Sequence, residues 1–306
     1  MQEHQFQATR EFARSMDEQD PLKDFREQFY FPQREDGSPK IYFCGNSLGL
    51  QPKAVKDYLT IELEDWQKLG VDGHFQGSNP WFHYHKFFTE SLKNLTGGND
   101  HEVIAMNTLS VNLHLMMVSF YRPTPVRYKI LIEAGAFPSD QYAVESQIRY
   151  HGFDPHEAII EIAPRQGEHT IRNEDIIQAI GNHREELALV LLPGVQFYSG
   201  QFFDIPTITQ TAHEVGAYAG FDLAHAIGNV PLRLHDWEVD FAVWCSYKYL
   251  NSGPGGVGGA FVHEKYADKE LPRFAGWWGH NEESRFSMEK NFEPEYGAQG
   301  WQLSRS

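Results

Sequence analysis

Short, fully apolar segments alternate with longer amphipathic ones along most of this chain, and this alternation restricts the fold more than any other feature. The clearest apolar segment is Leu187 to Leu192, which lacks the polar alternation of a strand with one face in water. Strands of this kind are buried on both faces, and the helices between them provide the cover. The pattern therefore predicts a three-layer α/β/α fold with a mainly parallel central sheet.

The spacing of apolar residues places the individual elements. Helices are expected at 54–69, 110–121, 141–149 and 205–215, and strands at 103–106, 129–132, 187–192, 218–221, 242–245 and 260–262. Ser110 is the expected N-cap of the second of these helices. The first forty residues are charged and interrupted by prolines, so we expect an N-terminal helical arm at 1–48 and one large domain at 49–306.

Composition excludes several classes of function. The chain carries 26 Lys and Arg against 42 Asp and Glu, a formal net charge of −16, and it has no basic cluster that would bind nucleic acid. No apolar run approaches the roughly 18 residues of a membrane span, and the polar N-terminus has no signal-peptide core. Cys44 and Cys245 are the only cysteines, as is usual in a reducing compartment. We therefore expect a cytoplasmic protein with neither a nucleic-acid nor a membrane partner.

Two polar residues follow predicted strands. Asp222 comes directly after the strand that ends at Phe221, and Lys248 lies three residues after the strand that ends at Cys245. If these strands are parallel neighbours, both residues lie at the edge of the sheet where ligands bind. The pair is then either a structural ion pair or a site for pyridoxal phosphate (PLP). In a PLP site the lysine forms a Schiff base and the acid keeps the ring nitrogen protonated.

Neighbouring segments are compatible with both interpretations. The run Gly253–Gly259 holds five glycines in seven residues, which permits a tight turn or a close approach to a ligand or a strand. Ser110 is either an ordinary N-cap or a phosphate ligand. The segment from Phe137 to Asp140 is either a turn, with Ser139 or Asp140 as helix cap, or an aromatic face and carboxylate of a cofactor pocket; both roles are compatible.

A metal site is the other possibility that the sequence raises. His74, His83 and His85 lie near one another, but the spacing of the last two places them on one face only in a strand, and their surroundings are typical of helix or loop. No cysteine or carboxylate completes the set at ligand spacing, so no metal site is predicted.

A set of longer motifs then identifies a family. In chain order they are Tyr42 to Leu50 (YFCGNSLGL), Val111 to Leu115 (VNLHL), Phe137 to Asp140 (FPSD), Phe221 to Ala226 (FDLAHA), Trp244 to Asn251 (WCSYKYLN) and Gly276 to His280 (GWWGH). With these motifs the chain resembles the kynureninases, which are PLP enzymes of fold type I.

The resemblance implies a role for each matching residue. Lys248 would form the Schiff base and move protons at the substrate Cα, Asp222 would pair with the ring nitrogen, and His225 would lie near the cofactor. Tyr247 would bond the phosphate and serve as a general acid. The other implied cofactor contacts are Leu109, Ser110, Phe137 (stacked on the ring), Pro138, Ser139, Asp140 and Trp277 (across a dimer interface), with Ser47 and His74 on the substrate side.

The implied activity is hydrolysis of L-kynurenine or 3-hydroxykynurenine to anthranilate or 3-hydroxyanthranilate and L-alanine, in tryptophan catabolism and NAD biosynthesis, by a cytoplasmic homodimer. Another fold type I activity, such as an aminotransferase or a desulfurase, would use the same lysine and aspartate. A different class of alternative is a PLP-binding remnant that acts only as a dimerising or binding protein.

Two departures from the family pattern motivate that alternative. Pro193 stands where a serine is usual near the cofactor, so one hydrogen bond is expected to be absent. Arg305 stands where the family has an asparagine, and the sequence ends at Ser306, where family members continue into a C-terminal small domain. That domain carries an arginine expected to bind the substrate carboxylate, so the resemblance predicts a large domain without it.

Overall fold

The computed structural model describes residues 6–304, and its contacts divide the chain into two units. The first unit is Met1–Gly45 with Leu50–Pro80, and the second is Asn46–Gly49 with Trp81–Ser306. The first contains α1 (Arg10–Gln19), η1 (Lys23–Gln28), α2 (Val55–Leu69) and η2 (Gly70–His74). The expected succession of helices and loops in the first forty residues is therefore found, while the predicted boundary at residue 48 stays a prediction.

The second unit contains the sheet and its helices. In chain order its elements are η3 (Trp81–Phe88), α3 (Thr89–Thr96), β1 (Val103–Ala105), α4 (Leu109–Phe120), β2 (Lys129–Glu133), α5 (Pro138–Tyr150), α6 (Pro155–Ala158), β3 (Ile159–Ile162), α7 (Asn173–Asn182), β4 (Leu187–Pro193), α8 (Ile205–Glu214), β5 (Tyr218–Asp222), β6 (Phe241–Trp244), β7 (Gly259–Val262), η4 (Glu264–Tyr266), η5 (Trp277–Gly279), η6 (Arg285–Ser287) and η7 (Gly297–Trp301). None of the helices within residues 6–304 is long and apolar enough to cross a membrane.

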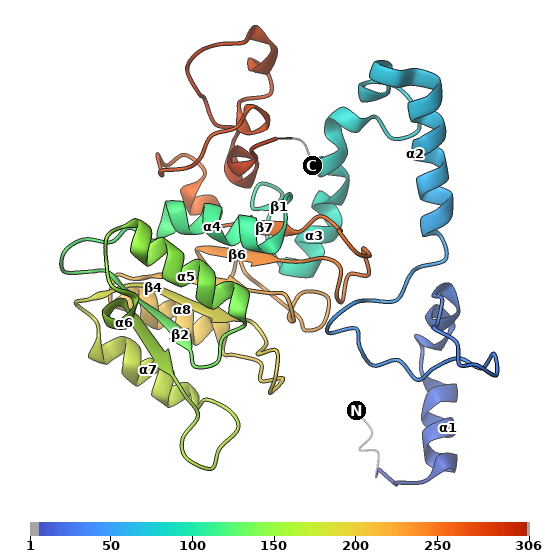
Figure 1. Ribbon diagram of the computed structural model, residues 1–306, viewed down its shortest axis with the longest axis horizontal. Helices are drawn as coiled ribbons and strands as arrows, with labels where there is room; N and C mark the ends of the chain where they lie inside the picture. The colour runs from blue at the N-terminus through green and yellow to red at the C-terminus, as the bar shows by residue number, and fades with distance from the viewer. Residues whose placement is uncertain (1–5, 305–306) are drawn as a thin grey trace. The chain divides into compact units, whose positions relative to one another are not determined.

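The strands form one sheet of seven in the order β1-β7-β6-β5-β4-β2-β3 (Figure 1). Neighbouring strands from β6 to β3 run parallel. Only β7 is antiparallel, to β6 on one side and to β1 on the other. The expected mainly parallel sheet is confirmed, and the carboxyl ends of β2, β4, β5 and β6 meet at one edge.

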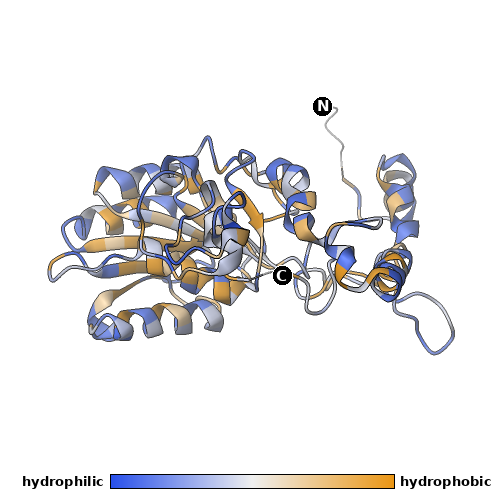
Figure 2. Cartoon of the chain, turned by 90° about the horizontal axis from the view of Figure 1, so that it is seen from above, coloured by the Kyte–Doolittle hydropathy of each residue, from blue (hydrophilic) through white to orange (hydrophobic). Residues whose placement is uncertain are grey.

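Helices cover both faces of this sheet. Figure 1 shows α4 and α5 side by side on one face, where Phe120 and Val144 pack against sheet residues such as Leu191. On the other face α3, α7 and α8 bury residues such as Ile176 and Ile208. Figure 2 shows the mostly apolar strands between helices whose outer sides are hydrophilic. The predicted three layers are therefore present.

Several predicted elements need correction. Ser110 is not the N-cap of its helix: that position is Thr108, and Ser110 is the second residue of α4. The next helix begins at Pro138 rather than at Gln141, because proline suits the first turn. Consequently neither Ser139 nor Asp140 is its N-cap. The strand β3 was not predicted from the sequence, and neither were the helices α3, α6 and α7.

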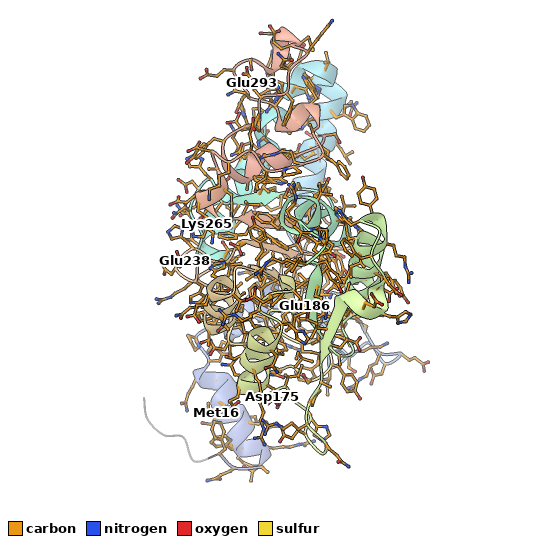
Figure 3. The ribbon with its side chains drawn as sticks, turned by 90° about the vertical axis from the view of Figure 1, so that its left-hand side faces the viewer. Met16, Asp175, Glu186, Glu238, Lys265 and Glu293 are labelled. Atoms are coloured by element: carbon orange, nitrogen blue, oxygen red, sulfur yellow. The ribbon has the colours of Figure 1, made fainter. Side chains whose placement is uncertain are left out.

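A buried polar cluster ties β5 to β6 at their amino ends. Asp240 accepts hydrogen bonds from the Ala219 N–H at 2.7 Å and from His213 Nε2 at 2.9 Å, and Lys265 Nζ lies 2.8 Å from its carboxylate. Burial alone would raise the pKa of Asp240, but His213 and Lys265 hold it below its usual value. Lys265 also donates to the Glu238 carbonyl at 2.9 Å, and both residues are labelled in Figure 3. These bonds support the two strands that carry the polar residues described next.

Candidate functional site

A cavity opens at the carboxyl ends of β2, β4, β5 and β6, where the sequence predicted a site. Most of the predicted cofactor residues are brought together here from separate parts of the chain. Its lining consists of Leu109, Ser110, Glu133, Phe137, Ser139, Asp140, Pro193, Val195, Phe197, Asp222, Ala224, His225, Tyr247 and Lys248.

Asp222 is the last residue of β5, and β5 and β6 are parallel neighbours, as the prediction from sequence required. Its side chain is only 8% exposed, and one carboxylate oxygen accepts the Ala224 N–H at 2.6 Å. Burial raises the pKa of Asp222. A buried carboxylate of this kind requires a cationic or hydrogen-bonding partner, and the cavity is where a ligand would supply one.

Lys248 and His225 are joined by a hydrogen bond between their side chains. Lys248 Nζ lies 2.9 Å from His225 Nε2, and 5.7 Å from the centre of the Phe137 ring. Burial, and secondarily the charge of Lys248, lowers the pKa of His225 to about 4. The imidazole is therefore neutral near pH 7, so Nε2 accepts the hydrogen bond and the lysine donates it.

Tyr247 lies beside Lys248 and beside Cys245. Burial, and then the neighbouring Cys245, raises the pKa of Tyr247 to about 12. Its hydroxyl therefore keeps its proton at every physiological pH and acts as a hydrogen-bond donor or as an acid, not as a base.

The start of α5 places an aromatic ring and a carboxyl group in the cavity. Phe137 is the residue before the helix, and its ring meets Phe197 edge-on with centroids 5.3 Å apart. Asp140 lies in the first turn and is within hydrogen-bonding reach of Asp222. Burial and the nearby charge of Asp222 raise the pKa of Asp140 well above its ordinary value.

The start of α4 offers a site for an anion. Leu109 and Ser110 are its first two residues, and the N–H groups of a first turn have no partner within their own helix. The turn before the helix is fixed by Asn112, whose Nδ2 donates to the Met106 carbonyl at 2.8 Å. Gly258 closes the turn because its N–H donates to the Asn107 carbonyl at 2.7 Å. A side chain at Gly258 would collide with the backbone of Trp244, which explains one glycine of the Gly253–Gly259 run.

Four predicted residues are not part of the lining. Pro138 begins α5 but does not line the cavity. Trp277 lies in η5, with its indole N–H donating to the Arg285 carbonyl at 3.1 Å. Ser47 is exposed. His74 belongs to η2, which is part of the other unit. The roles assigned to all four stay predictions.

Of the two residues that depart from the family pattern, Pro193 and Arg305, the structure describes only the first. Pro193 is the last residue of β4 and lines the cavity, paired in register with Asp222. It offers neither a side-chain donor nor an N–H, so it cannot donate the hydrogen bond that a serine would donate here. Arg305 lies outside the described residues.

Part of the lining was not predicted from the sequence, and Glu133 matters most among these residues. Glu133 is the last residue of β2 and is 4% exposed. Burial raises its pKa to about 8. The signal that could have found it is its position after an apolar strand, but the predicted strand ended at Ile132. The other lining residues that were missed are Val195, Phe197 and Ala224.

A larger cavity of about 530 Å³ lies elsewhere in the second unit, lined by aromatic and aliphatic residues that include Trp81, Trp244 and Trp278. Its one histidine is His85, whose pKa burial lowers to about 4, and within residues 6–304 its lining contains no lysine and no carboxylate. The predicted chemistry therefore belongs to the smaller cavity.

His83, one of the histidines considered for a metal site, is paired with Glu282, with Nδ1 and Oε1 3.3 Å apart.

Glu102, His235 and His263 form a cluster of metal-ligating residue types that was not predicted from the sequence. Glu102 is fully buried, and its carboxylate lies 3.0 Å from His235 Nδ1 and 2.8 Å from the Glu264 N–H. His263 Nδ1 accepts the Lys265 N–H at 3.1 Å. Each candidate ligand atom thus already has a partner within the protein, in a polar cluster beside β1 and β7.

Comparison with known sequences gives consistent matches. Residues 53–286 match the family described as aminotransferase class-V. A kynureninase from Myxococcus xanthus is 57% identical over 300 residues, which cover 98% of this chain and 70% of that protein. A kynureninase from Flavobacterium psychrophilum is equally similar over the same shares, and one from Nematostella vectensis is 54% identical over 97% of this chain and 66% of its own length.

Comparison with solved structures supports the fold. A mutant of C-DES with glycine covalently linked to its PLP cofactor superposes with a TM-score of 0.71 at 16% identity, covering 92% of this chain and 69% of that one. The cysteine desulfurase CsdA of Escherichia coli gives a TM-score of 0.70 at 14% identity, covering 92% and 67%. At such identities the likeness shows a shared fold only.

Proposed function

Because the chain belongs to the kynureninase family, we propose that it is a PLP-dependent hydrolase that converts L-kynurenine, or its 3-hydroxy form, to anthranilate, or 3-hydroxyanthranilate, and L-alanine. The reaction breaks the Cβ–Cγ bond of the substrate and adds the elements of water across it. The similarity to kynureninases extends over nearly the whole chain, which favours hydrolysis over a non-catalytic binding role. Other fold type I activities are not favoured, because the desulfurases share only the fold.

The residues of the cavity fit PLP. Bound PLP supplies a carbonyl carbon for an amine and a cationic ring that withdraws electrons from the substrate Cα and Cβ. Lys248 is the single lysine among the lining residues and would hold that carbon through Nζ. The buried Asp222 would hold the ring nitrogen, with Phe137 against the ring. The first turn of α4, at Leu109 and Ser110, would hold the phosphate.

Lys248 and His225 together handle the proton at Cα. The neutral imidazole accepts a hydrogen bond from Nζ at 2.9 Å, so it fixes the direction of the amine without adding a second positive charge. A free lysine amine in this position takes the Cα proton from the substrate and can return it. His225 is thus a positioning residue, and Lys248 carries the proton.

Tyr247 supplies a proton donor beside this lysine. Water must add to the substrate γ-carbonyl before the Cβ–Cγ bond can break, and the oxygen that gains negative charge in that step needs a hydrogen-bond donor. The Tyr247 hydroxyl is protonated throughout the physiological range. We assign it the role of general acid and hydrogen-bond donor.

The observation that carries this proposal is the position of Lys248, held by neutral His225 in a cavity that also contains buried Asp222. The test is to add PLP to the purified protein, record its visible absorption, and then add L-kynurenine and measure anthranilate fluorescence. We expect a bound-cofactor band and fluorescent product. Lys248→Ala should remove both, and Lys290→Ala, which changes an exposed lysine, should remove neither.

The possible outcomes separate the alternatives. A cofactor band without product would favour the non-catalytic alternative. A chain that shows no cofactor band, or a Lys248→Ala variant that keeps the wild-type band, would overturn the proposal.

The proposal includes a homodimer in the cytoplasm that serves tryptophan catabolism and NAD biosynthesis. Support for the dimer comes from α2, on which Tyr58, Leu59, Leu63 and Trp66 are each more than half exposed although all are large and apolar. Support for the cytoplasm comes from the two cysteines, both of which are free.

Light scattering of the eluting protein tests the dimer. We expect twice the chain mass for the wild type and a shift toward the monomer when Leu63 and Trp66 are both changed to Glu. Glu64→Gln, a change on the same helix, should leave the mass unchanged.

A further inference from the structure

Glu133 places a third carboxyl group in the proposed cofactor cavity, where the proposed reaction does not use it. It ends β2, and the cavity it lines also contains Asp140 from α5 and Asp222 from β5. Glu133 and Asp140 lie close together in the sequence, at the end of β2 and the start of α5, and Asp222 joins them because β2, β4 and β5 are successive parallel strands. Glu133 and Asp222 are buried, with 4% and 8% of their surface exposed, and Asp140 is partly buried.

Few positive charges are available to these three acids. The influences on the Glu133 carboxyl are its burial, its own backbone N–H and the negative charge of Asp222, and no cation is among them. Lys248 is the one lysine in the lining, and its Nζ is already hydrogen-bonded to His225. Three carboxylates cannot all ionise beside one cation in a site from which water is excluded. Protons must therefore remain on some of them.

Two titratable groups that line the cofactor cavity with Glu133 do not change charge near neutral pH. His225 has a pKa lowered to about 4 by burial, and Tyr247 has one raised to about 12. Glu133 also lines a second cavity of about 310 Å³ with His169 and Gln196. Burial raises the pKa of Glu133 to about 8, so it is protonated near pH 7 and can exchange its proton through that second cavity.

We propose that Glu133 is a proton-storing residue of the cofactor site, which holds a proton when the cavity lacks a cation and releases it when a cationic ring nitrogen is placed against Asp222. The inference rests on the proposed function, since it takes the cation to be that of PLP. The balance is one proton: the ring nitrogen brings its N–H and positive charge to the side of Asp222, and one proton leaves Glu133 for the solvent. The new carboxylate then offsets the positive charge of the ring nitrogen locally, so Asp222 stays the anion that holds that nitrogen.

Calorimetry can count this proton. PLP is titrated into the protein near pH 7 in two buffers of different ionisation enthalpy, and the difference in heat gives the number of protons released. We expect the wild type to release more than Glu133→Gln, by a difference that approaches one proton. The amide of Gln copies the shape of the protonated carboxyl, so the variant should still bind PLP. Glu161→Gln, an exposed change on the adjacent strand β3, should behave as the wild type.

A second readout follows the carboxyl group itself. The infrared difference spectrum between PLP-bound and PLP-free protein should lose the carbonyl stretch of a protonated carboxyl group, and Glu133→Gln should not show that loss. Equal proton release by wild type and Glu133→Gln, or an unchanged carboxyl band in the wild type, would overturn the inference. Failure of the proposed function is distinguishable, since the wild type would then show neither a heat of binding nor a cofactor band with PLP.

Discussion

Replacing Gly220 by alanine should destabilise the protein although it adds a single methyl group. Gly220 lies in β5 directly opposite Phe241 of β6, and a Cβ at this position would overlap the Phe241 ring. That ring is fully buried and stacks on Phe120, with centroids 5.0 Å apart and planes inclined by 24°, so it has no space to retreat. Overpacking of a closed core costs about 1–3 kcal/mol. For a domain of this size that corresponds to a fall in melting temperature of roughly 2–12 °C.

Gly181→Ala is a matched control, because the same change of residue type should there have the opposite effect on stability. Gly181 is exposed near the end of α7, has no positive φ, and leaves open space within 4 Å of the point where a methyl group would be added. Gly181→Ala should therefore stabilise the protein by about 0.4–1 kcal/mol, through the unfolded chain. Thermal unfolding followed by circular dichroism compares both variants with the wild type. A Gly220→Ala protein that melts at or above the wild-type temperature would refute the packing argument.

The same substitution should also affect the site, because Gly220 lies two residues before Asp222 on β5. If β5 is displaced from β6, Asp222 moves relative to Lys248, and PLP affinity should fall together with stability. Adding Phe241→Leu to Gly220→Ala frees volume at the point of overlap. The double variant should therefore be more stable than the sum of the two single effects predicts.

Three further substitutions test the chemistry and the electrostatics. Tyr247→Phe should retain the cofactor band but lower kcat by about 10²–10⁴-fold, the usual contribution of a general acid, and a near-normal rate would remove that role. Asp222→Asn should weaken PLP binding about tenfold to a hundredfold, as expected for a lost hydrogen bond to a charged group, measured by absorbance titration. The hydrogen bond with Glu102 raises the pKa of His235 above 6.5. The contribution of this hydrogen bond to the free energy of unfolding is therefore complete below pH 6.5 and is lost as the pH rises through the raised pKa of His235. In urea unfolding, His235→Gln should differ from the wild type under acidic conditions and converge with it under alkaline ones.

The strands could be predicted because each is buried on both faces. Leu187 to Leu192 is apolar throughout, and no polar alternation confuses its assignment. The strand that was missed, β3, is one of the two edge strands, and its residues are half-buried or exposed, whereas β1 at the other edge is mostly buried and was predicted. A sequence signal that depends on complete burial is weakest where the sheet ends. The same reason accounts for α7, whose apolar face is only two residues deep, at Ile176 and Ile180.

Asp222 and Lys248 could be located from sequence because they follow adjacent parallel strands, a relation that chain order alone suggests. Other parts of the site depend on information that the sequence does not hold. Ser110 was expected as a cap but is the second residue of α4, because a helix start is uncertain by a residue or two. His74 was given a role on the substrate side; it belongs to the other unit, and that role stays a prediction.

Glu133 shows most clearly where prediction from sequence stops. The rule that found Asp222 applies equally to Glu133, since each is the last residue of a parallel strand and each turns a carboxyl group into the cavity. Ending the strand one residue early, at Ile132, left Glu133 unnoticed, although a charged residue after three apolar ones is a visible pattern. Even with the correct boundary, its function would not follow from the sequence, because its proton affinity arises from burial and from the nearby charge of Asp222. Residue type predicts which groups can carry charge, but only the packing of the sheet determines how many of them carry it at once.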